Sequence, residues 1–183
     1  MPPKPCKTNR NLTIPTPGFF KPRSIPDSAA APVGAYFFYG TLADPALLAE
    51  ILDLDSLPEL RPARIFGYKV KLWGQYPAVI SVDESPPGTD SDCVVEGFVY
   101  RVERVQHVER LAEYETGNYR PGACLIVYTD GPANGLKGRP FEEQGYVFQY
   151  VGNMNELNDG VFDLGAWFKL MGRDATVGSE TRA

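Results

Sequence analysis

The feature that most constrains the fold of this chain is a series of short apolar segments that are rich in aromatic and β-branched residues. Such segments, bounded by polar or Gly/Pro-containing connections, are typical of β-strands. They are AYFFYG (35–40), PARIFGYKVKLWG (62–74), YPAVISV (76–82), CVVEGFVYRV (93–102), ACLIVYT (123–129) and GYVFQYVG (145–152). Strands therefore outnumber helices. This pattern predicts an α+β domain built around a mixed, barrel-like sheet with a few flanking helices.

Helical signals occur at three places along the chain. Asp44 and Pro45 predict a helix start, because an aspartate can cap the first turn and proline is tolerated at the first helical position. The segment VERVQHVERLAEYE (102–115) has apolar residues at helical spacing and predicts a second helix that ends at Glu115. The segment FDLGAWFKLMG (162–172) predicts a closing helix.

The chain divides into three parts by composition. Residues 1–34 are rich in proline and lack periodicity, which predicts a flexible N-terminal arm that is disordered or draped over the domain. Residues 35–172 carry the strand and helix signals and predict one domain, long enough to bury a sizeable core. Residues 173–183 are expected to form a C-terminal tail.

Charge and composition argue against several classes of function. The net charge of −5 and the lack of a basic cluster disfavour a nucleic-acid or anionic membrane partner. The cysteines are scattered and odd in number, without metal-ligand spacing or a disulfide framework, so a reducing compartment is expected. No apolar run reaches the length of a membrane span, and the N-terminus lacks an apolar signal core. We therefore expect a cytoplasmic protein, whose oligomeric state the sequence does not indicate.

The chain contains a single histidine, His107. That count excludes a metal site with two histidine ligands within one chain, and any Ser-His or Cys-His scheme would depend on this one residue. Its surroundings, ERVQHVER (103–110), predict a solvated helix face. If the protein is an enzyme, its proton transfers should run through a carboxylate, and neither a metal nor another cofactor is expected.

Glu115 is unusual because it continues the apolar face of the second predicted helix. The other residues of this face are Val105, Val108, Leu111 and Ala112. If Glu115 faces inward, burial and the helix C-terminus should both raise its pKa, which would suit a general base. Alternatively, the helix ends early and Glu115 is solvated or pairs with Arg120. Glu113 should lie on the outer face in either case.

The segment YGTL, Tyr39 to Leu42, forms the predicted junction between the first strand and the first helix. A glycine-containing turn at such a junction can direct successive backbone N–H groups toward one anionic or polar ligand. The alternative is that Gly40 only allows the chain to turn.

Three segments together resemble the γ-glutamylcyclotransferase-like superfamily, and its avirulence-induced branch of plants and filamentous fungi in particular. They are FFYGTL (37–42), EGFVY (96–100) and LAEYETGNYRPGACLIV (111–127). The order and spacing of these motifs carry the resemblance, which covers roughly residues 35–170. It implies a γ-glutamylcyclotransferase-like fold and a small-molecule substrate.

The resemblance also implies roles for individual residues. Its Tyr-Gly-Ser/Thr-Leu turn, which holds substrate, matches Tyr39, Gly40, Thr41 and Leu42, and its Leu-x-x-aromatic-Glu motif makes Glu115 catalytic. Tyr76, in a segment that resembles the family's Tyr-Pro segment, and Tyr119 are candidates for lining the pocket. The chain departs from many members at Ala112, where they have aspartate, and at Thr116, where they have glycine.

The implied reaction is the cyclisation of a γ-glutamyl compound to 5-oxoproline with release of an amine or amino acid. Glu115 would act as general acid and base. Two other functions stay open: a different cyclisation, elimination or rearrangement in fungal specialised metabolism, with Glu115 still the base, and a binding module without enzymatic activity.

Overall fold

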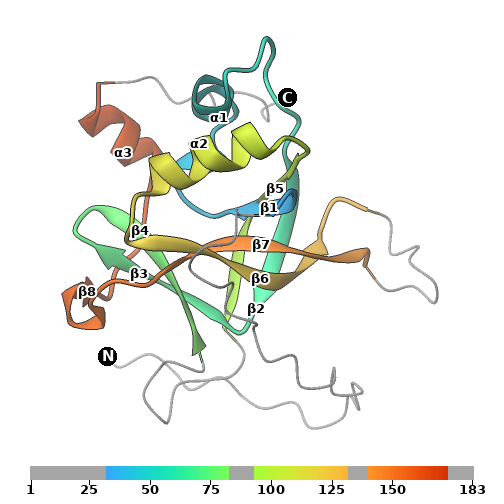
Figure 1. Cartoon of the computed structure of the whole chain (residues 1–183). Helices are drawn as coiled ribbons and strands as arrows, with labels where there is room; N and C mark the ends of the chain where they lie inside the picture. The colour runs from blue at the N-terminus through green and yellow to red at the C-terminus, as the bar shows by residue number, and fades with distance from the viewer. Residues whose placement is uncertain (1–31, 83–92, 132–139, 173–183) are drawn as a thin grey trace, which may run out of the picture.

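The computed structural model describes residues 32–82, 93–131 and 140–172 (Figure 1). Residues 1–31 of the predicted arm and the predicted tail lie outside these described residues. Gly34, which the sequence placed at the end of the arm, begins the first strand.

Five strands form a closed barrel in the order β1-β5-β2-β6-β7. Their bounds are β1 (Gly34–Phe38), β2 (Arg61–Phe66), β5 (Val94–Val102), β6 (Tyr119–Tyr128) and β7 (Glu142–Tyr150). All neighbours are antiparallel except β1 and β7, which run parallel and close the barrel with Tyr36 opposite Tyr146. The predicted mixed, barrel-like sheet of an α+β domain is thereby confirmed.

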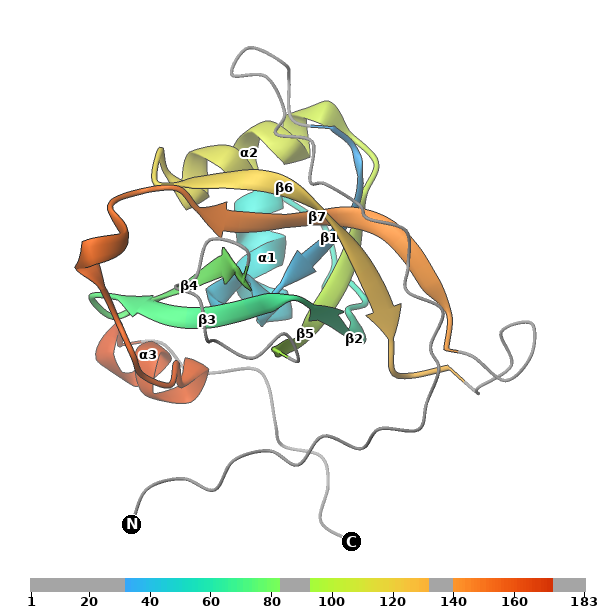
Figure 2. The ribbon, with the colours of Figure 1, turned by 90° about the horizontal axis from the view of Figure 1, so that it is seen from below.

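A second sheet has the order β4-β3-β8, with β3 at Tyr68–Trp73, β4 at Tyr76–Ser81 and β8 at Leu157–Asn158. Segment 62–74, predicted as one strand, therefore forms two strands in different sheets. Gly67 separates them with a φ of +82°, a conformation that glycine adopts without a steric penalty. Seen from below, the β3–β4 hairpin lies beside β7 (Figure 2).

Three helices gather on one side of the sheets (Figure 1), namely α1 (Pro45–Leu52), α2 (Val105–Glu115) and α3 (Leu164–Leu170). The described residues also include the short 3₁₀ turns η1 (Thr41–Ala43) and η3 (Met154–Glu156). The predicted helix start is confirmed, because the Asp44 carboxylate accepts a hydrogen bond of 2.8 Å from the Leu47 N–H. None of the helices in the described parts of the chain is long and apolar enough to cross a membrane.

The buried face of α2 is narrower than the sequence predicted. Val108 and Leu111 are fully buried, whereas Val105 is 46% exposed and Ala112 is also exposed. Val105 and Ala112 are seven residues apart, so they share one edge of the helix, and this edge is turned toward solvent. The opposite edge is partly buried and includes His107, which the sequence predicted to be solvated. Burial, followed by Arg104 and Arg110, lowers the pKa of His107.

Candidate active site

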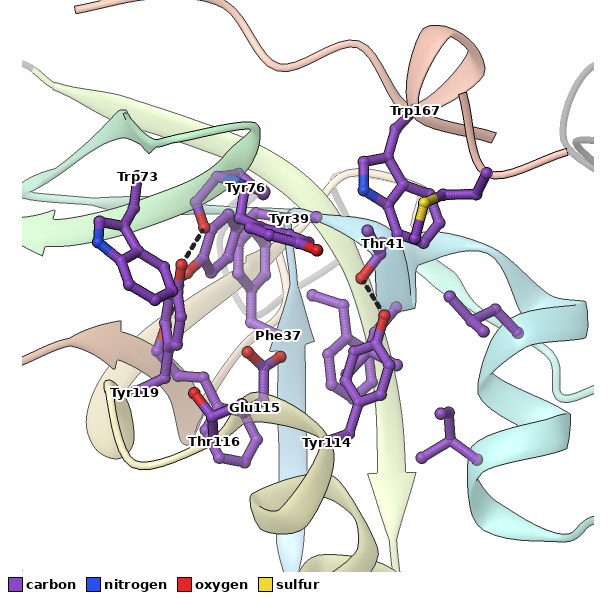
Figure 3. A pocket seen from close by; sticks show the side chains of 18 of the residues that line it. Phe37, Tyr39, Thr41, Trp73, Tyr76, Tyr114, Glu115, Thr116, Tyr119 and Trp167 are labelled. Carbon is purple, nitrogen blue, oxygen red and sulfur yellow. Dashed lines mark hydrogen bonds between the residues drawn. The ribbon is translucent and has the colours of Figure 1, made fainter. Parts of the chain in front are cut away.

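A cavity of about 480 Å³ lies where the helices meet the barrel and the β3–β4 hairpin (Figure 3). Its walls come from the end of β1, the turn that follows, α1, the hairpin, the end of α2, the start of β6, β7, and the middle and C-terminal end of α3. Residues that are far apart in the sequence thus face one space. The seven predicted site residues all line it: Tyr39, Gly40, Thr41, Leu42, Tyr76, Glu115 and Tyr119.

Glu115 is the last residue of α2, and its carboxylate points into the cavity (Figure 3). The residue as a whole is partly exposed because it lines an open space, but protein atoms surround the carboxylate. Burial raises the pKa of Glu115 from 4.5 to about 8. The ion pairs and hydrogen bonds between described residues include none to Glu115, so the alternative of a Glu115–Arg120 pair is not found. A carboxyl group in this state can both accept and return a proton near neutral pH.

Glu115 faces the cavity because of its place on α2. Val108 and Leu111 pack into the main hydrophobic core, and Glu115 follows them by seven and four residues on the same face. The packing of these two residues therefore turns Glu115 inward as well. Glu113, two residues earlier, is exposed on the outer face, as predicted.

The Tyr39 hydroxyl connects two strands beside the cavity. It donates a hydrogen bond to the Phe148 carbonyl (2.8 Å) and accepts one from the Val79 N–H (3.1 Å). Burial, and secondarily the charge of Glu115, raises the pKa of Tyr39 well above its ordinary value. Because its hydroxyl already holds β4 against β7, Tyr39 can contribute its ring and backbone to a ligand more readily than its O–H group.

Two further hydrogen bonds hold the cavity wall together (Figure 3). The hydroxyls of Thr41 and Tyr114 lie 2.8 Å apart and join the turn after β1 to the end of α2. The Tyr119 hydroxyl donates to the Pro77 carbonyl at 3.3 Å and joins β6 to β4. The groups around Glu115 are therefore fixed to one another before any ligand enters, which favours precise positioning.

Several lining residues were not predicted from the sequence. Tyr114 directly precedes Glu115 in the helix motif, and this position could have been used to predict that Tyr114 lines the cavity. Trp73 and Trp167 lie on the hairpin and on α3, and no local pattern links either segment to the end of α2. Within the described ranges, no group of three or more His, Cys, Asp or Glu side chains is placed to hold a metal ion.

Gly40 is required by close packing and not by an unusual φ, which is −122°. A Cβ atom added here would lie 2.7 Å from the Pro77 Cγ, far inside ordinary contact distance. The turn after β1 therefore packs directly against β4. Gly40 thus has a specific packing role between two walls of the cavity, in addition to any role in the turn.

Gly40→Ala should lower the free energy of unfolding by about 1–3 kcal/mol, because the turn or the Pro77 ring must move to admit the methyl group. The matched control is Gly131→Ala, where an added Cβ meets nothing within 4 Å and the effect should be small. Urea denaturation of both variants measures the difference. Equal stability of Gly40→Ala and the parent would show that the contact with Pro77 is not needed.

Thr116 occupies a strained backbone conformation directly after Glu115. Its φ of 63° and ψ of −180° lie in a region that is essentially restricted to glycine. The sequence resemblance implied a glycine at this position. The threonine side chain lines the cavity (Figure 3), so the chain keeps a β-branched residue here in spite of the strain.

Thr116→Gly should raise the free energy of unfolding by about 1 kcal/mol. Relief of strain contributes roughly 1–3 kcal/mol, and the greater flexibility of glycine in the unfolded chain offsets roughly 0.5–1 kcal/mol of it. Thr129→Gly is the control, because Thr129 has no positive φ and should only be destabilised. Thermal or urea unfolding compares the two. A loss of stability in Thr116→Gly as large as that in Thr129→Gly would argue against strain.

The fold and the cavity together define an α+β barrel domain with a pocket of small-molecule size. Comparison of the sequence with known families assigns the domain to a single family. The chain belongs to the family described as gamma-glutamyl cyclotransferase, AIG2-like, whose model matches residues 36–169. This match confirms the resemblance drawn from the sequence motifs.

Two solved structures of low sequence identity share the fold, and a third shows a weaker likeness. A solution structure from Arabidopsis thaliana is 19% identical, with a TM-score of 0.53, and the match covers 80% of this chain and 87% of that one. A second Arabidopsis thaliana solution structure is 23% identical, with a TM-score of 0.50, and covers 79% of each chain. A yeast gamma-glutamyl cyclotransferase specific to glutathione is 18% identical, with a TM-score of 0.46, and covers 65% of this chain and 69% of that one. No curated protein gives a significant match.

Proposed function

We propose that this protein is a γ-glutamylcyclotransferase, which converts a γ-glutamyl compound into 5-oxoproline and a free amine or amino acid. Membership of the family supports the reaction class. The observation that carries the proposal is the Glu115 carboxyl group, which points into the cavity with a pKa raised to about 8. Glu115 would act as both general base and general acid.

The reaction needs no group beyond the substrate and one proton carrier. The α-amino nitrogen of the glutamyl group attacks its own γ-carbonyl carbon, a new C–N bond closes the five-membered ring, and the C–N bond to the departing amine breaks. Because nucleophile and electrophile belong to one molecule, holding the substrate folded can supply up to about 7–11 kcal/mol of the barrier reduction.

Glu115 would carry the protons that this displacement requires. The α-amino group enters as an ammonium, loses one proton before it attacks and loses a second as the ring amide forms. The departing nitrogen takes up one of these protons to leave as an amine, and the other goes to that amine or to water. The pKa of an α-ammonium is about 8 or above, so a carboxyl group with a pKa of about 8 exchanges a proton with it at little cost. An ordinary solvated glutamate would be a much weaker base.

The turn from Tyr39 to Leu42 would hold the polar part of the substrate. It begins the 3₁₀ turn η1, where the first backbone N–H groups have no partner within the turn itself. Such groups can bind a carboxylate or the oxyanion that develops on the γ-carbonyl oxygen. Tyr76 and Tyr119 would line the same end of the cavity.

A panel of γ-glutamyl peptides and γ-glutamyl amines, incubated with the full chain and assayed for 5-oxoproline, tests the proposal. Release of 5-oxoproline together with equimolar amine from at least one compound is the expected result. Absence of 5-oxoproline from every compound would contradict it. If the compounds bound without turnover, the alternatives of another rearrangement or of a binding module would be favoured.

A further inference from the structure

Thr116 has a backbone conformation that its own side chain disfavours. In the described parts of the chain, the non-glycine residues with positive φ are Asp53 and Thr116. Asp53 ends α1 with φ and ψ of 56° and 55°, in the left-handed region that aspartate tolerates. Thr116 lies in a region essentially restricted to glycine, where a β-branched residue is an outlier. Strain of this kind is concentrated at functional sites, so we examined what the threonine side chain could contribute there.

The Thr116 side chain lies beside the proposed proton carrier. It follows Glu115 directly and lines the same cavity, and Figure 3 shows it on the side of Glu115 where Tyr119 lies. Its Oγ1 accepts one long hydrogen bond, of 3.5 Å, from the Asn118 N–H. A hydroxyl oxygen has two lone pairs, so Oγ1 can also accept a hydrogen bond from a ligand in the cavity. Branching at Cβ restricts χ1, which fixes the direction of the hydroxyl group more firmly than in serine.

Four other hydroxyl groups of the cavity wall hold segments of the protein together. Those of Tyr39 and Tyr119 bond to the backbone of β4 and β7 or of β4 alone. Those of Thr41 and Tyr114 bond to each other. The hydrogen bond of Thr116, in contrast, is local and long, and it joins no distant segments. Its hydroxyl oxygen is therefore better placed to serve a ligand than to stabilise the fold.

The surroundings of Thr116 favour a positively charged group of the ligand. α2 ends at Glu115, and the last carbonyl groups of a helix carry partial negative charge. The described residues that line the cavity include no lysine, arginine or histidine. An ammonium group has three N–H donors, and the Glu115 carboxylate and the Thr116 Oγ1 offer it acceptors on adjacent residues. A γ-glutamyl compound carries one such group, its α-ammonium.

We propose that the Thr116 hydroxyl oxygen binds the α-amino group of the substrate and holds it beside Glu115 for attack. The ammonium donates one N–H to the Glu115 carboxylate and another to Thr116 Oγ1. After a proton has moved to Glu115, the hydrogen bond to Thr116 keeps the nitrogen next to the γ-carbonyl carbon, which favours ring closure. Thr116 is thus a substrate-binding residue. This inference rests on the proposed cyclisation and adds a second contact to the nucleophile.

Binding of two small probes tests this contact without turnover. L-glutamine is the simplest γ-glutamyl amide, and glutaramate differs from it only by lacking the α-ammonium. Calorimetry measures their dissociation constants on Glu115→Gln and on the double variant Glu115→Gln/Thr116→Val. The Thr116→Val change should weaken binding of L-glutamine by about tenfold or more and that of glutaramate by less than about twofold, because only L-glutamine loses a charge-assisted hydrogen bond. Equal changes for the two probes, or no change for L-glutamine, would overturn the inference.

Three further changes, each combined with Glu115→Gln, separate binding from folding. Thr116→Ser keeps a hydroxyl group and should retain most of the affinity for L-glutamine. Thr129→Val makes the same chemical change as Thr116→Val at an exposed position outside the cavity and should leave the affinity unchanged. Thr116→Gly should lose affinity as Thr116→Val does, although relief of strain raises its stability. A Thr116→Gly variant that keeps its affinity for L-glutamine would show that the hydroxyl group makes no contact with the ammonium.

The two proposals can fail separately. On a γ-glutamyl compound that releases 5-oxoproline, Thr116→Val should lower kcat/KM by about tenfold or more, and Thr116→Ser should restore most of it. If Thr116→Val is as active as the parent, the cyclisation stands and the inference about Thr116 is wrong. If no compound yields 5-oxoproline, the cyclisation is wrong, and L-glutamine and glutaramate still decide whether Thr116 binds an α-ammonium group.

Discussion

Glu115→Gln should lower turnover by about two orders of magnitude or more, the usual scale for a positioned general base. Glutamine keeps the size of the side chain and much of its hydrogen-bonding capacity but cannot accept a proton at neutral pH. Turnover is measured on whichever γ-glutamyl compound releases 5-oxoproline. Activity equal to that of the parent would exclude Glu115 as the proton carrier.

The same substitution should stabilise the folded protein at neutral pH. Glu115 has a folded-state pKa of about 8, raised above its ordinary value of 4.5, so folding favours its protonated form. Below pH 4.5, Glu115 is protonated in both the folded and the unfolded state and does not lower the free energy of unfolding. As the pH rises from 4.5 to 8, the unfolded state ionises first, so the free energy of unfolding falls. At pH 7, glutamine removes this loss, and the free energy of unfolding should rise by an amount on the order of 1–3 kcal/mol.

Glu113→Gln is the matched control for both effects. It makes the same chemical change two residues away, on the exposed outer face of α2. Turnover and melting temperature should stay close to those of the parent. A loss of activity in Glu113→Gln as large as in Glu115→Gln would point to a general effect of charge on α2 and not to the carboxylate in the cavity.

The kcat/KM of the parent protein should rise nearly tenfold per pH unit well below pH 8 and less steeply near pH 8, so that it increases about 50-fold between pH 6 and pH 8. The reason is that Glu115, with a pKa of about 8, must be ionised to take the proton of the substrate ammonium. At higher pH the curve should level off and then follow the titration of the substrate's own amino group.

The assignment of this limb to Glu115 is checked by comparing pH profiles. Glu113→Gln should retain the rising limb with its apparent pKa of about 8. The residual activity of Glu115→Gln should rise only with the titration of the substrate's own amino group, without a plateau that reports the Glu115 pKa. A parent profile that is flat between pH 6 and 8 would show that the ionising group has an ordinary carboxyl pKa or that Glu115 does not limit the rate.

Local signals in the sequence were sufficient for much of the fold and for the central residue of the site. The cap at Asp44 follows from local chemistry, as the capping hydrogen bond shows. The inward direction of Glu115 follows from its spacing behind Val108 and Leu111, because the period of a helix is independent of the rest of the fold. The turn at Tyr39–Leu42 was placed beside Glu115 only through the family resemblance.

Features that depend on contacts between distant segments were not predictable. The division of segment 62–74 depends on Gly67 sending β2 and β3 into different sheets, and a glycine within an apolar run is also compatible with one continuous strand. The rotation of α2, which exposes Val105 and partly buries His107, is set by packing on the barrel. The contact between Gly40 and Pro77 joins two segments that local sequence does not relate.

The parallel pairing of β1 with β7 has a consequence for how this protein is made. β1 is the first strand of the described chain, and its partner β7 is synthesised much later. The barrel can therefore close only after Tyr146 of β7 is available to pair with Tyr36 of β1. Pairing of such remote segments slows folding, and until it occurs one edge of β1 has no neighbour. A nascent or truncated chain that ends before Glu142 would present that edge to other chains, so it should aggregate or be degraded and not persist as a stable partial barrel.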